Sequence, residues 1–287
     1  MPSTTTSHPE QGTQPVLSVR NLDVRYGDVA AVTGADLDIH PGQRVAIVGE
    51  SGSGKTSLGN AVAGFQPAAA TITADRLELQ GTALDRSSAQ PIPTRTPGLS
   101  MIFQDAMRSL DPVWTVGSQL LAVLKPGRSR KEAHRAALGW LDEVGITDPE
   151  RVMDVYPHQL SGGMRQRVMM AIALASKPSL LIADEPTSAL DASLAVTAMR
   201  LIVSMAERED AAVLVITHDI ELCRHFADVV VVMYHGEIVE TIAASDLDRA
   251  QHPYTRGLVA CVPTLASAKL EELPTLASVM GTEGDAA

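Results

Sequence analysis

The sequence contains very little cysteine: Cys223 and Cys261 are the only two in 287 residues. Two thiols are too few for the disulfide framework of a small secreted domain. They are also too few for a structural zinc site or an iron–sulfur site, each of which needs about four ligands. The scarcity of cysteine therefore favours a reducing, cytoplasmic setting.

Long apolar runs and basic character are missing as well. No stretch of about 18 uninterrupted apolar residues occurs, so the sequence offers no transmembrane helix, and a membrane function would need another chain to span the bilayer. Residues 1–14 lack the basic start and apolar centre of a secretory signal, and we expect them to be a disordered leader. The formal net charge of −11 gives no support to a nucleic-acid partner, although a local basic patch stays open.

The chain does contain a regular alternation of apolar runs and helical patterns. Residues 17–48 are strand-like and end in the apolar run RVAIV, and residues 71–79 predict another strand. Residues 115–175 are helical, with RKEAHRAALGWLDEVG the clearest amphipathic stretch. From Leu180 the strands LLIA, AVLVIT and VVVVM alternate with helices, one of them at about 192–208. This pattern predicts an α/β fold in which a parallel sheet is covered on both faces and carries a helical insertion.

The stretch GESGSGKT, residues 49–56, matches the phosphate-loop pattern of glycine, four residues, then Gly-Lys-Thr. Glycines let successive amides point at a phosphate, and the following helix adds its dipole. Lys55 is predicted to reach the β- and γ-phosphates, and the Thr56 hydroxyl to bind Mg²⁺. The predicted nucleotide-contacting set in this region is Gly49, Glu50, Ser51, Gly52, Ser53, Gly54, Lys55, Thr56 and Ser57.

Four polar residues follow other apolar runs. Asp184 and Glu185 follow LLIA, His218 follows AVLVIT, and Gln104 ends MIFQ. Ligands of open α/β folds bind at the carboxyl ends of strands, so all four are expected on the rim that carries the phosphate loop. Alone, an Asp-Glu pair is explained as solvated acids in a turn, and a single histidine as a structural one.

On that rim each residue has a predicted role. Gln104 joins Thr56 as a Mg²⁺ ligand, and Asp184 completes the predicted Mg²⁺ site by contacting the ion through its bound water. Glu185 is placed to polarise an attacking water, and His218 to hydrogen-bond the γ-phosphate and hold Glu185 in register.

Two further features have alternative interpretations. Ser161, Gly162 and Gly163 in YPHQLSGGMRQRV form a helix start with exposed amides but no lysine, which fits either a second anion contact or a plain capped helix. Tyr26 follows the first strand, and it fits either an adenine-stacking ring or a strand-end aromatic.

Together and in this order, the motifs resemble the ATP-binding subunits of ATP-binding-cassette (ABC) transporters over about residues 17–263. Tyr26 matches the adenine-stacking aromatic, residues 49–56 the Walker A loop, and Gln104 the Q-loop. LSGGMRQ matches the family signature, LLIADE the Walker B strand, SALD (188–191) the D-loop, and His218 the H-loop.

The resemblance implies a P-loop NTPase core with a mostly parallel sheet, an N-terminal antiparallel β subdomain and an inserted α-helical subdomain. The ABC domain is expected at 15–265, with the helical subdomain at about 105–175 and a partly disordered tail at 266–287.

Three stretches resemble the peptide, opine and nickel importer branch of this family: FQDAMRSLDPVWTVGSQL, YPHQLSGGMRQRVMMAIAL and HPYTRGLVACVP. Ala106 stands where proline is usual in that branch. Many members carry a cysteine cluster after the last motif that holds an iron–sulfur centre. Because Cys261 stands alone in that region, no iron–sulfur cluster is expected, and the implied cofactors are ATP and Mg²⁺.

The resemblance also implies partners. Two ATPase subunits pair head to tail, so that each ATP lies between one Walker A loop and the Ser161, Gly162 and Gly163 of the other subunit. The second subunit is expected to be a distinct homologous chain, with a homodimer as the alternative. The pair would drive two transmembrane permeases at the cytoplasmic face of the cell membrane, supplied by an external solute-binding protein.

Three other functions fit the sequence less well. A soluble ABC ATPase acting on nucleic acid or ribosomes usually needs a long coiled-coil insertion or two cassettes, and this chain has one motif set. An ABC exporter subunit is disfavoured by HPYTRGL. A non-catalytic nucleotide sensor is disfavoured by the presence of both Glu185 and His218.

Overall fold

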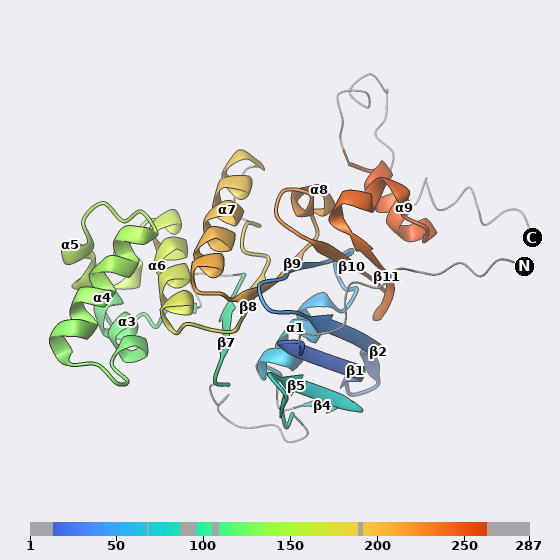
Figure 1. Cartoon of the computed structure of the whole chain (residues 1–287), viewed down its shortest axis with the longest axis horizontal. Coiled ribbons are helices and arrows are strands. Elements are labelled where there is room, and N and C mark those ends of the chain that lie inside the picture. Colours follow the sequence, from blue (N-terminus) through green and yellow to red (C-terminus); the bar gives the residue numbers. More distant parts are fainter. Residues whose placement is uncertain (1–13, 68, 87–95, 105–108, 189–191, 263–287) are drawn as a thin grey trace, which may run out of the picture.

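In the computed structural model, the described residues are 14–67, 69–86, 96–104, 109–188 and 192–262. They form an α/β core flanked by an antiparallel sheet on one side and a lobe of helices on the other (Figure 1). The expected leader apart from Gln14, the position Ala106, residues 189–191 of SALD, and the expected tail lie outside the described residues.

The strands fall into two sheets, and helices α3 to α6 form the helical lobe. The strands are β1 (Leu17–Tyr26), β2 (Val29–Ile39), β3 (Arg44–Val48), β4 (Ala70–Thr73), β5 (Arg76–Leu79), β6 (Thr82–Ala83), β7 (Leu99–Ile102), β8 (Leu180–Asp184), β9 (Ala212–Thr217), β10 (Val229–Tyr234) and β11 (Glu237–Ala243). The helices are α1 (Lys55–Ala63), α3 (Val116–Leu124), α4 (Arg130–Glu143), α5 (Pro149–Met153), α6 (Gly162–Ala175), α7 (Ala192–Arg208), α8 (Ile220–Cys223) and α9 (Pro253–Ala260), with 3₁₀ turns η1 (Pro157–Gln159) and η2 (Ala244–Arg249).

The core sheet has the strand order β11-β10-β3-β9-β8-β7. All neighbouring pairs are parallel except the edge strand β11, which runs antiparallel to β10. Successive parallel strands are joined through helices, which cover the faces of the sheet. The predicted mostly parallel α/β core is thereby confirmed, and β11 adds an edge strand that the apolar pattern did not indicate.

Alternate residues of the core strands face two separate hydrophobic clusters. In β3, Val45 and Ile47 pack with α1 and the antiparallel sheet, whereas Ala46 and Val48 pack with the helices of the opposite side. Side chains alternate across a strand, so a continuous apolar run such as RVAIV indicates burial on both faces. The site residues that follow these strands therefore project from a rigid, doubly covered sheet.

The antiparallel sheet has the order β2-β1-β5-β6, and β4 also pairs with β1. The prediction of one strand at 71–79 was wrong in extent, because β4 pairs with the second half of β1 and β5 with the first half. Between those halves Asn21 has a φ of +49°, and the register of β1 against β2 shifts. The irregularity in β1 interrupts the ladder, so its partner divides into two strands.

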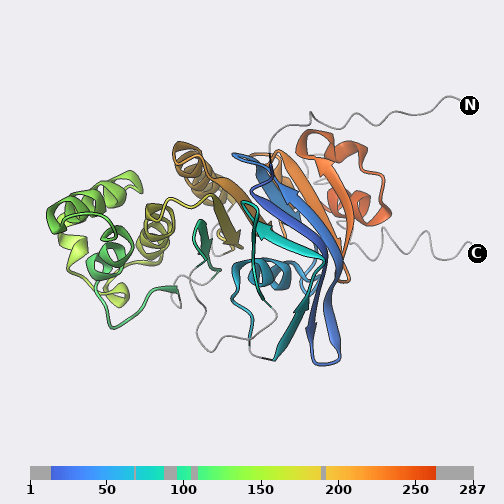
Figure 2. The same ribbon diagram turned by 60° about the horizontal axis from the view of Figure 1, so that its bottom comes forward.

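The helical lobe, α3 to α6, is inserted between β7 and β8 (Figures 1 and 2). Helix α4 begins with a capping box in which Ser129 and Glu132 exchange hydrogen bonds. It buries Ala133, Ala137 and Trp140 along one face, as its sequence pattern predicts.

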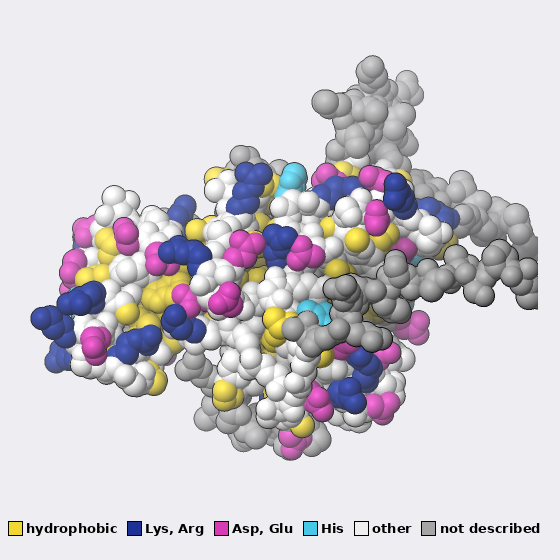
Figure 3. Space-filling model, in the orientation of Figure 1, with side chains coloured by type: hydrophobic (Ala, Val, Ile, Leu, Met, Phe, Trp, Pro, Cys, Tyr) yellow, Lys and Arg dark blue, Asp and Glu magenta, His cyan; other side chains and the backbone are white. Residues whose placement is uncertain are grey.

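Basic side chains gather at the free end of this lobe (Figure 3). Residues 125–135, between α3 and the middle of α4, contain five Lys or Arg and a single acid, Glu132. The negative net charge of the chain therefore belongs to other parts of the molecule. No helix in the described ranges is both long enough and apolar enough to cross a membrane.

Candidate functional site

Four adjacent strands of the core sheet end at one edge and place the predicted residues there. In the order β3, β9, β8 and β7, they lead into the phosphate loop, His218, Glu185 and Gln104. The register pairs Val48 with Thr217, and Asp184 with Ile216. Residues from four distant parts of the chain thus share the carboxyl edge of a single parallel sheet.

The phosphate loop needs glycine at two positions for lack of space. Gly49 and Gly54 have φ values of +156° and +100°. A Cβ at Gly49 would lie 2.2 Å from the Met233 carbonyl oxygen, and one at Gly54 would lie 2.2 Å from the Ala31 carbonyl oxygen. The loop therefore lies directly against the backbones of β10 and β2, which fix its curl.

Lys55 lies inside the curl and is 5% exposed. Its Nζ donates to the carbonyl oxygens of Gly49 at 2.8 Å and Glu50 at 2.7 Å, and lies 3.3 Å from Ser53 Oγ. Burial lowers the pKa of Lys55 below its ordinary value, and nearby carboxylates oppose that shift. Within the described ranges, the hydrogen-bond acceptors of this ammonium group are all neutral, and it could exchange them for phosphate oxygens.

Thr56 and Asp184 place two oxygen donors side by side next to the loop. Thr56 Oγ1 donates to Asp184 Oδ1 at 3.2 Å. Asp184 is 5% exposed, and burial raises its pKa although the Thr56 hydrogen bond opposes the shift. A hydroxyl beside a carboxylate suits Mg²⁺, which prefers oxygen ligands. Gln104, the third residue of the predicted Mg²⁺ site, is exposed at the end of β7, and the residues that follow it (105–108) are outside the described ranges.

Glu185 and His218 form a pair next to Asp184. His218 Nδ1 lies 3.0 Å from both carboxylate oxygens of Glu185. The Glu185 N–H donates to the Ile216 carbonyl at 2.8 Å, and Glu185 has a φ of +44°, which is unusual for a residue other than glycine. Glu185 is thus held twice by the neighbouring strand: its backbone by Ile216 in β9, and its side chain by His218, which directly follows β9. The predicted contact between the two side chains is present, and the role of Glu185 as a base stays a prediction.

Ser161, Gly162 and Gly163 are exposed at the start of α6. Ser161 Oγ accepts from Met164 N at 3.3 Å and so caps the helix. Both glycines are exposed, and nothing lies within 4 Å of a Cβ built on either one. No hydrogen bond in the described part of the chain joins this stretch to the phosphate loop of the same chain.

Helix α6 is nevertheless connected to the segment that carries Asp184 and Glu185. Gln166, one turn into the helix, donates from its side chain to the carbonyl of Pro186, the residue after Glu185. Of SALD, Ser188 is described, and its N–H donates to the Glu185 carbonyl at 3.2 Å.

Tyr26 lies at the end of β1, half-buried, beside the start of α1. Its hydroxyl lies 2.5 Å from Gln66 Oε1 and 3.3 Å from Ser57 Oγ. Gln66 in turn donates to the Ser57 carbonyl at 2.6 Å. The ring is thus held next to the helix that follows the phosphate loop, and no local pattern indicated Gln66 as its partner.

One residue that contacts the phosphate loop had no predicted chemical role. The Glu50 N–H donates to the hydroxyl oxygen of Tyr254 at 2.9 Å. Tyr254 belongs to the stretch HPYTRGL, which carried only a resemblance to a branch of the family. The contact joins positions 204 residues apart, so no spacing in the sequence could have indicated it.

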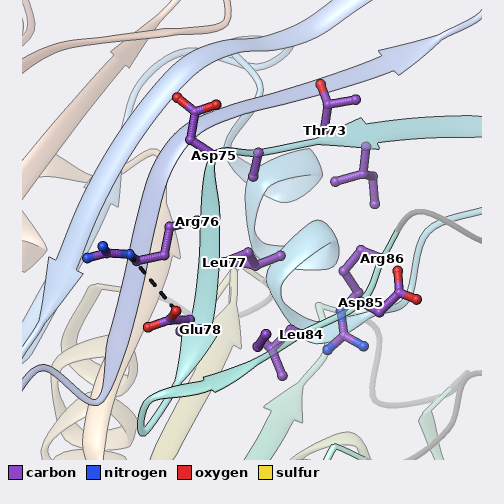
Figure 4. A pocket seen from close by; sticks show the side chains of 11 residues that line it. Thr73, Asp75, Arg76, Leu77, Glu78, Leu84, Asp85 and Arg86 are labelled. Carbon is purple, nitrogen blue, oxygen red and sulfur yellow. Dashed lines mark ion pairs between the residues drawn. The ribbon is translucent and has the colours of Figure 1, made fainter.

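A cavity of about 430 Å³ lies elsewhere, beside β4, β5 and β6 (Figure 4). Among its lining residues, Arg76 forms an ion pair with Glu78 at 4.0 Å. None of the predicted site residues lines this cavity.

Sequence comparisons show which known proteins the chain is similar to. The family described as ABC transporter matches residues 32–188. The chain is 40% identical over 273 residues to the dipeptide transport ATP-binding protein DppD of Escherichia coli K12, covering 92% of this chain and 83% of that protein. It is 42% identical over 259 residues to DppD of Bacillus subtilis 168, covering 87% and 77%.

Solved structures show the same fold. cbiO1 from Clostridium perfringens, part of the ABC transporter complex cbiONQ, superposes with a TM-score of 0.69 at 25% identity over 82% of this chain and 91% of its own. A post-hydrolysis dimer of the ATP-binding cassette MJ0796, bound to ADP and Pi, gives a TM-score of 0.64 at 26% identity over 79% and 98%.

Proposed function

The chain belongs to the ABC transporter family of ATP-binding proteins, and on that premise we propose that it is the ATP-hydrolysing subunit of a solute importer. The observation that carries the proposal is the meeting of the Lys55 loop, the Thr56–Asp184 pair and the Glu185–His218 pair at one sheet edge. The proposed ATP-binding unit comprises residues 15–265, with the helical lobe inserted at about 105–175.

The Lys55 loop and the two residue pairs each have a distinct task in this proposal. Lys55 exchanges the carbonyls of the loop for the β- and γ-phosphate oxygens, with the loop amides around it. Thr56, Asp184 and Gln104 would hold Mg²⁺, which when bound neutralises phosphate charge. Glu185 accepts a proton from the attacking water, and His218 keeps the carboxylate in place and faces the γ-phosphate.

The exposed Ser161, Gly162 and Gly163 are proposed to contact the γ-phosphate of an ATP held by a second ATPase subunit. These residues are exposed at a helix start that Ser161 caps, so they can bind an anion whose charge is already balanced elsewhere. Closing the dimer then depends on the γ-phosphate, and hydrolysis reopens it. The second subunit is a related, distinct chain in this proposal, and a second copy is the alternative.

An apolar surface between core and helical lobe is proposed to receive the permease. A cavity of about 280 Å³ there is lined by Phe65, Met101, Val123 and Ile172, among others. Trp114, in the segment before α3, is 58% exposed, which is unusual for so large an apolar side chain. Contact through this surface would place the chain peripherally at the cytoplasmic face of the membrane.

The proposed solute is a peptide or a related small compound, such as an opine, nickel or a metal chelate. Dipeptide, oligopeptide and glutathione transport proteins are all among the relatives, at 40–42% identity.

The test is to reconstitute the purified chain in lipid vesicles together with permease and solute-binding proteins encoded by neighbouring genes. We expect ATP-dependent uptake of a labelled dipeptide into vesicles. A Trp114→Ala variant should bind ATP normally but lose permease-stimulated hydrolysis. ATP-driven movement in the opposite direction, or no association with any permease, would contradict the importer assignment.

A further inference from the structure

A fully buried tyrosine outside the predicted site holds the phosphate loop. Tyr254, in α9, is 0% exposed. Its hydroxyl oxygen accepts the Glu50 N–H at 2.9 Å, while the Glu50 carbonyl accepts from Lys55 Nζ at 2.7 Å. Both backbone polar groups of Glu50 are therefore engaged: the C-terminal helix holds its N–H, and the site lysine and the Ser53 N–H, at 3.1 Å, hold its carbonyl.

The tyrosine is itself fixed on two sides. Its ring packs against Tyr234 at the end of β10, with ring centroids 4.2 Å apart. At the start of α9, His252 Nδ1 accepts from Tyr254 N at 3.2 Å. Glu240 on β11 accepts from the backbone N–H groups of Gln251 at 2.7 Å and His252 at 3.2 Å. The hydroxyl thus reaches Glu50 from a rigid support built by β10, β11 and α9.

Nucleotide binding changes what holds Glu50. When Lys55 turns to phosphate oxygens, the Glu50 carbonyl loses its ammonium partner and keeps the Ser53 N–H, while Tyr254 remains as the side chain that fixes the Glu50 N–H. The Glu50 N–H is in a partly buried contact, and backbone N–H groups kept from water almost always have partners, so a loop without the Tyr254 oxygen would rotate its Gly49–Glu50 peptide toward another acceptor or toward water. A loop with this peptide rotated no longer presents its amides to phosphate. The apparent affinity for ATP therefore falls in proportion to the fraction of molecules whose loop keeps the binding conformation.

We propose that Tyr254 is a positioning residue for the phosphate loop, and that α9 is thereby a structural part of the ATP site. The inference rests on the proposed ATP-binding function of the loop. It assigns a physical task to HPYT, a stretch that otherwise marks only a branch of the family.

Tyr254→Phe in the full-length chain tests the proposal, because it removes the oxygen and keeps the ring. We expect the Kd and KM for ATP to rise about five- to tenfold, the usual effect of leaving one partly buried backbone donor without its partner. The kcat should stay within about twofold, since the Glu185–His218 pair is untouched. Tyr234→Phe is the matched control, because it removes a phenol oxygen from the adjacent ring, whose hydroxyl makes no hydrogen bond to the loop within the described ranges.

Hydrogen exchange of the Glu50 amide gives a second readout that does not depend on turnover. In the nucleotide-free protein this amide should exchange faster in Tyr254→Phe and remain at the wild-type rate in Tyr234→Phe. Unchanged exchange and unchanged ATP affinity in Tyr254→Phe would overturn the inference, and so would equal effects of the two variants. If the wild-type chain bound no ATP, the proposed function itself would fail, which distinguishes the two outcomes.

Discussion

Replacing Glu185 by glutamine should abolish ATP hydrolysis and preserve ATP binding. The carboxylate has both oxygens 3.0 Å from His218 Nδ1, and its backbone N–H is bound to Ile216. Glutamine has the same shape, and its amide oxygen can still accept from the histidine, so the side chain should stay in place. What it loses is the ability to take a proton from water.

The expected magnitude follows from that single loss. A positioned general base contributes about 10²- to 10⁴-fold in rate, or roughly 3 to 5 kcal/mol of barrier. Lys55, Thr56 and Asp184 are unchanged in the variant, so the phosphate and metal contacts of the ground state persist. ATP affinity should therefore stay near that of the wild type, and closed dimers that cannot hydrolyse their ATP should accumulate.

All measurements use the full chain with its partner subunit. Phosphate release gives the hydrolysis rate, a binding titration gives the ATP affinity, and size-exclusion chromatography with ATP gives the amount of closed dimer. Glu143→Gln is the matched control, because that acid, at the end of α4, forms an ion pair with Arg208 at the end of α7, and the substitution should be nearly neutral. Undiminished steady-state ATPase activity in Glu185→Gln would refute the assignment of Glu185 as the base.

Four further substitutions, at three positions, separate the roles of the remaining site residues. Lys55→Ala removes a charged hydrogen-bond donor to phosphate and should weaken ATP binding about 10- to 100-fold, measured by calorimetry. Burial raises the pKa of Asp184, so its ionised form costs stability above its folded pKa and nothing below its ordinary pKa. Asp184→Asn should therefore raise the Tm of the nucleotide-free protein at neutral pH, with the gain vanishing in acid, while Mg²⁺-dependent hydrolysis is lost; a lower Tm at neutral pH would contradict this. Ser161→Ala should cost about 1 kcal/mol of stability through the lost helix cap. Ser161→Asp keeps a capping side chain but opposes a phosphate, so it should retain the Tm and lose ATP-dependent dimerisation.

Local residue patterns were sufficient for the parts of the molecule whose chemistry is local. The run RVAIV, the glycine spacing of the phosphate loop and the helix at 192–208 each depend on residues close in sequence, and the structure has β3, the curled loop and α7 at those positions. The mostly parallel sheet was also predictable, because apolar runs alternating with helices can bury both faces in few other ways.

Strand pairing decided what those patterns could not. The order β3-β9-β8-β7 puts Lys55, His218, Glu185 and Gln104 on one rim, and that order is set by packing between segments far apart in the chain. The division of the strand predicted at 71–79 follows from an irregularity in its partner β1, not from its own residues.

The hydrogen bonds of single side chains likewise depended on the tertiary structure. Tyr26 bonding to Gln66, Gln166 reaching Pro186 and Tyr254 holding Glu50 all join separate elements, and no periodicity encodes such contacts. The sequence by itself determined which chemistry is available, because motifs specify residue types at short spacings. Only the tertiary structure decided which atoms meet, because that depends on how two sheets and a helical lobe pack together.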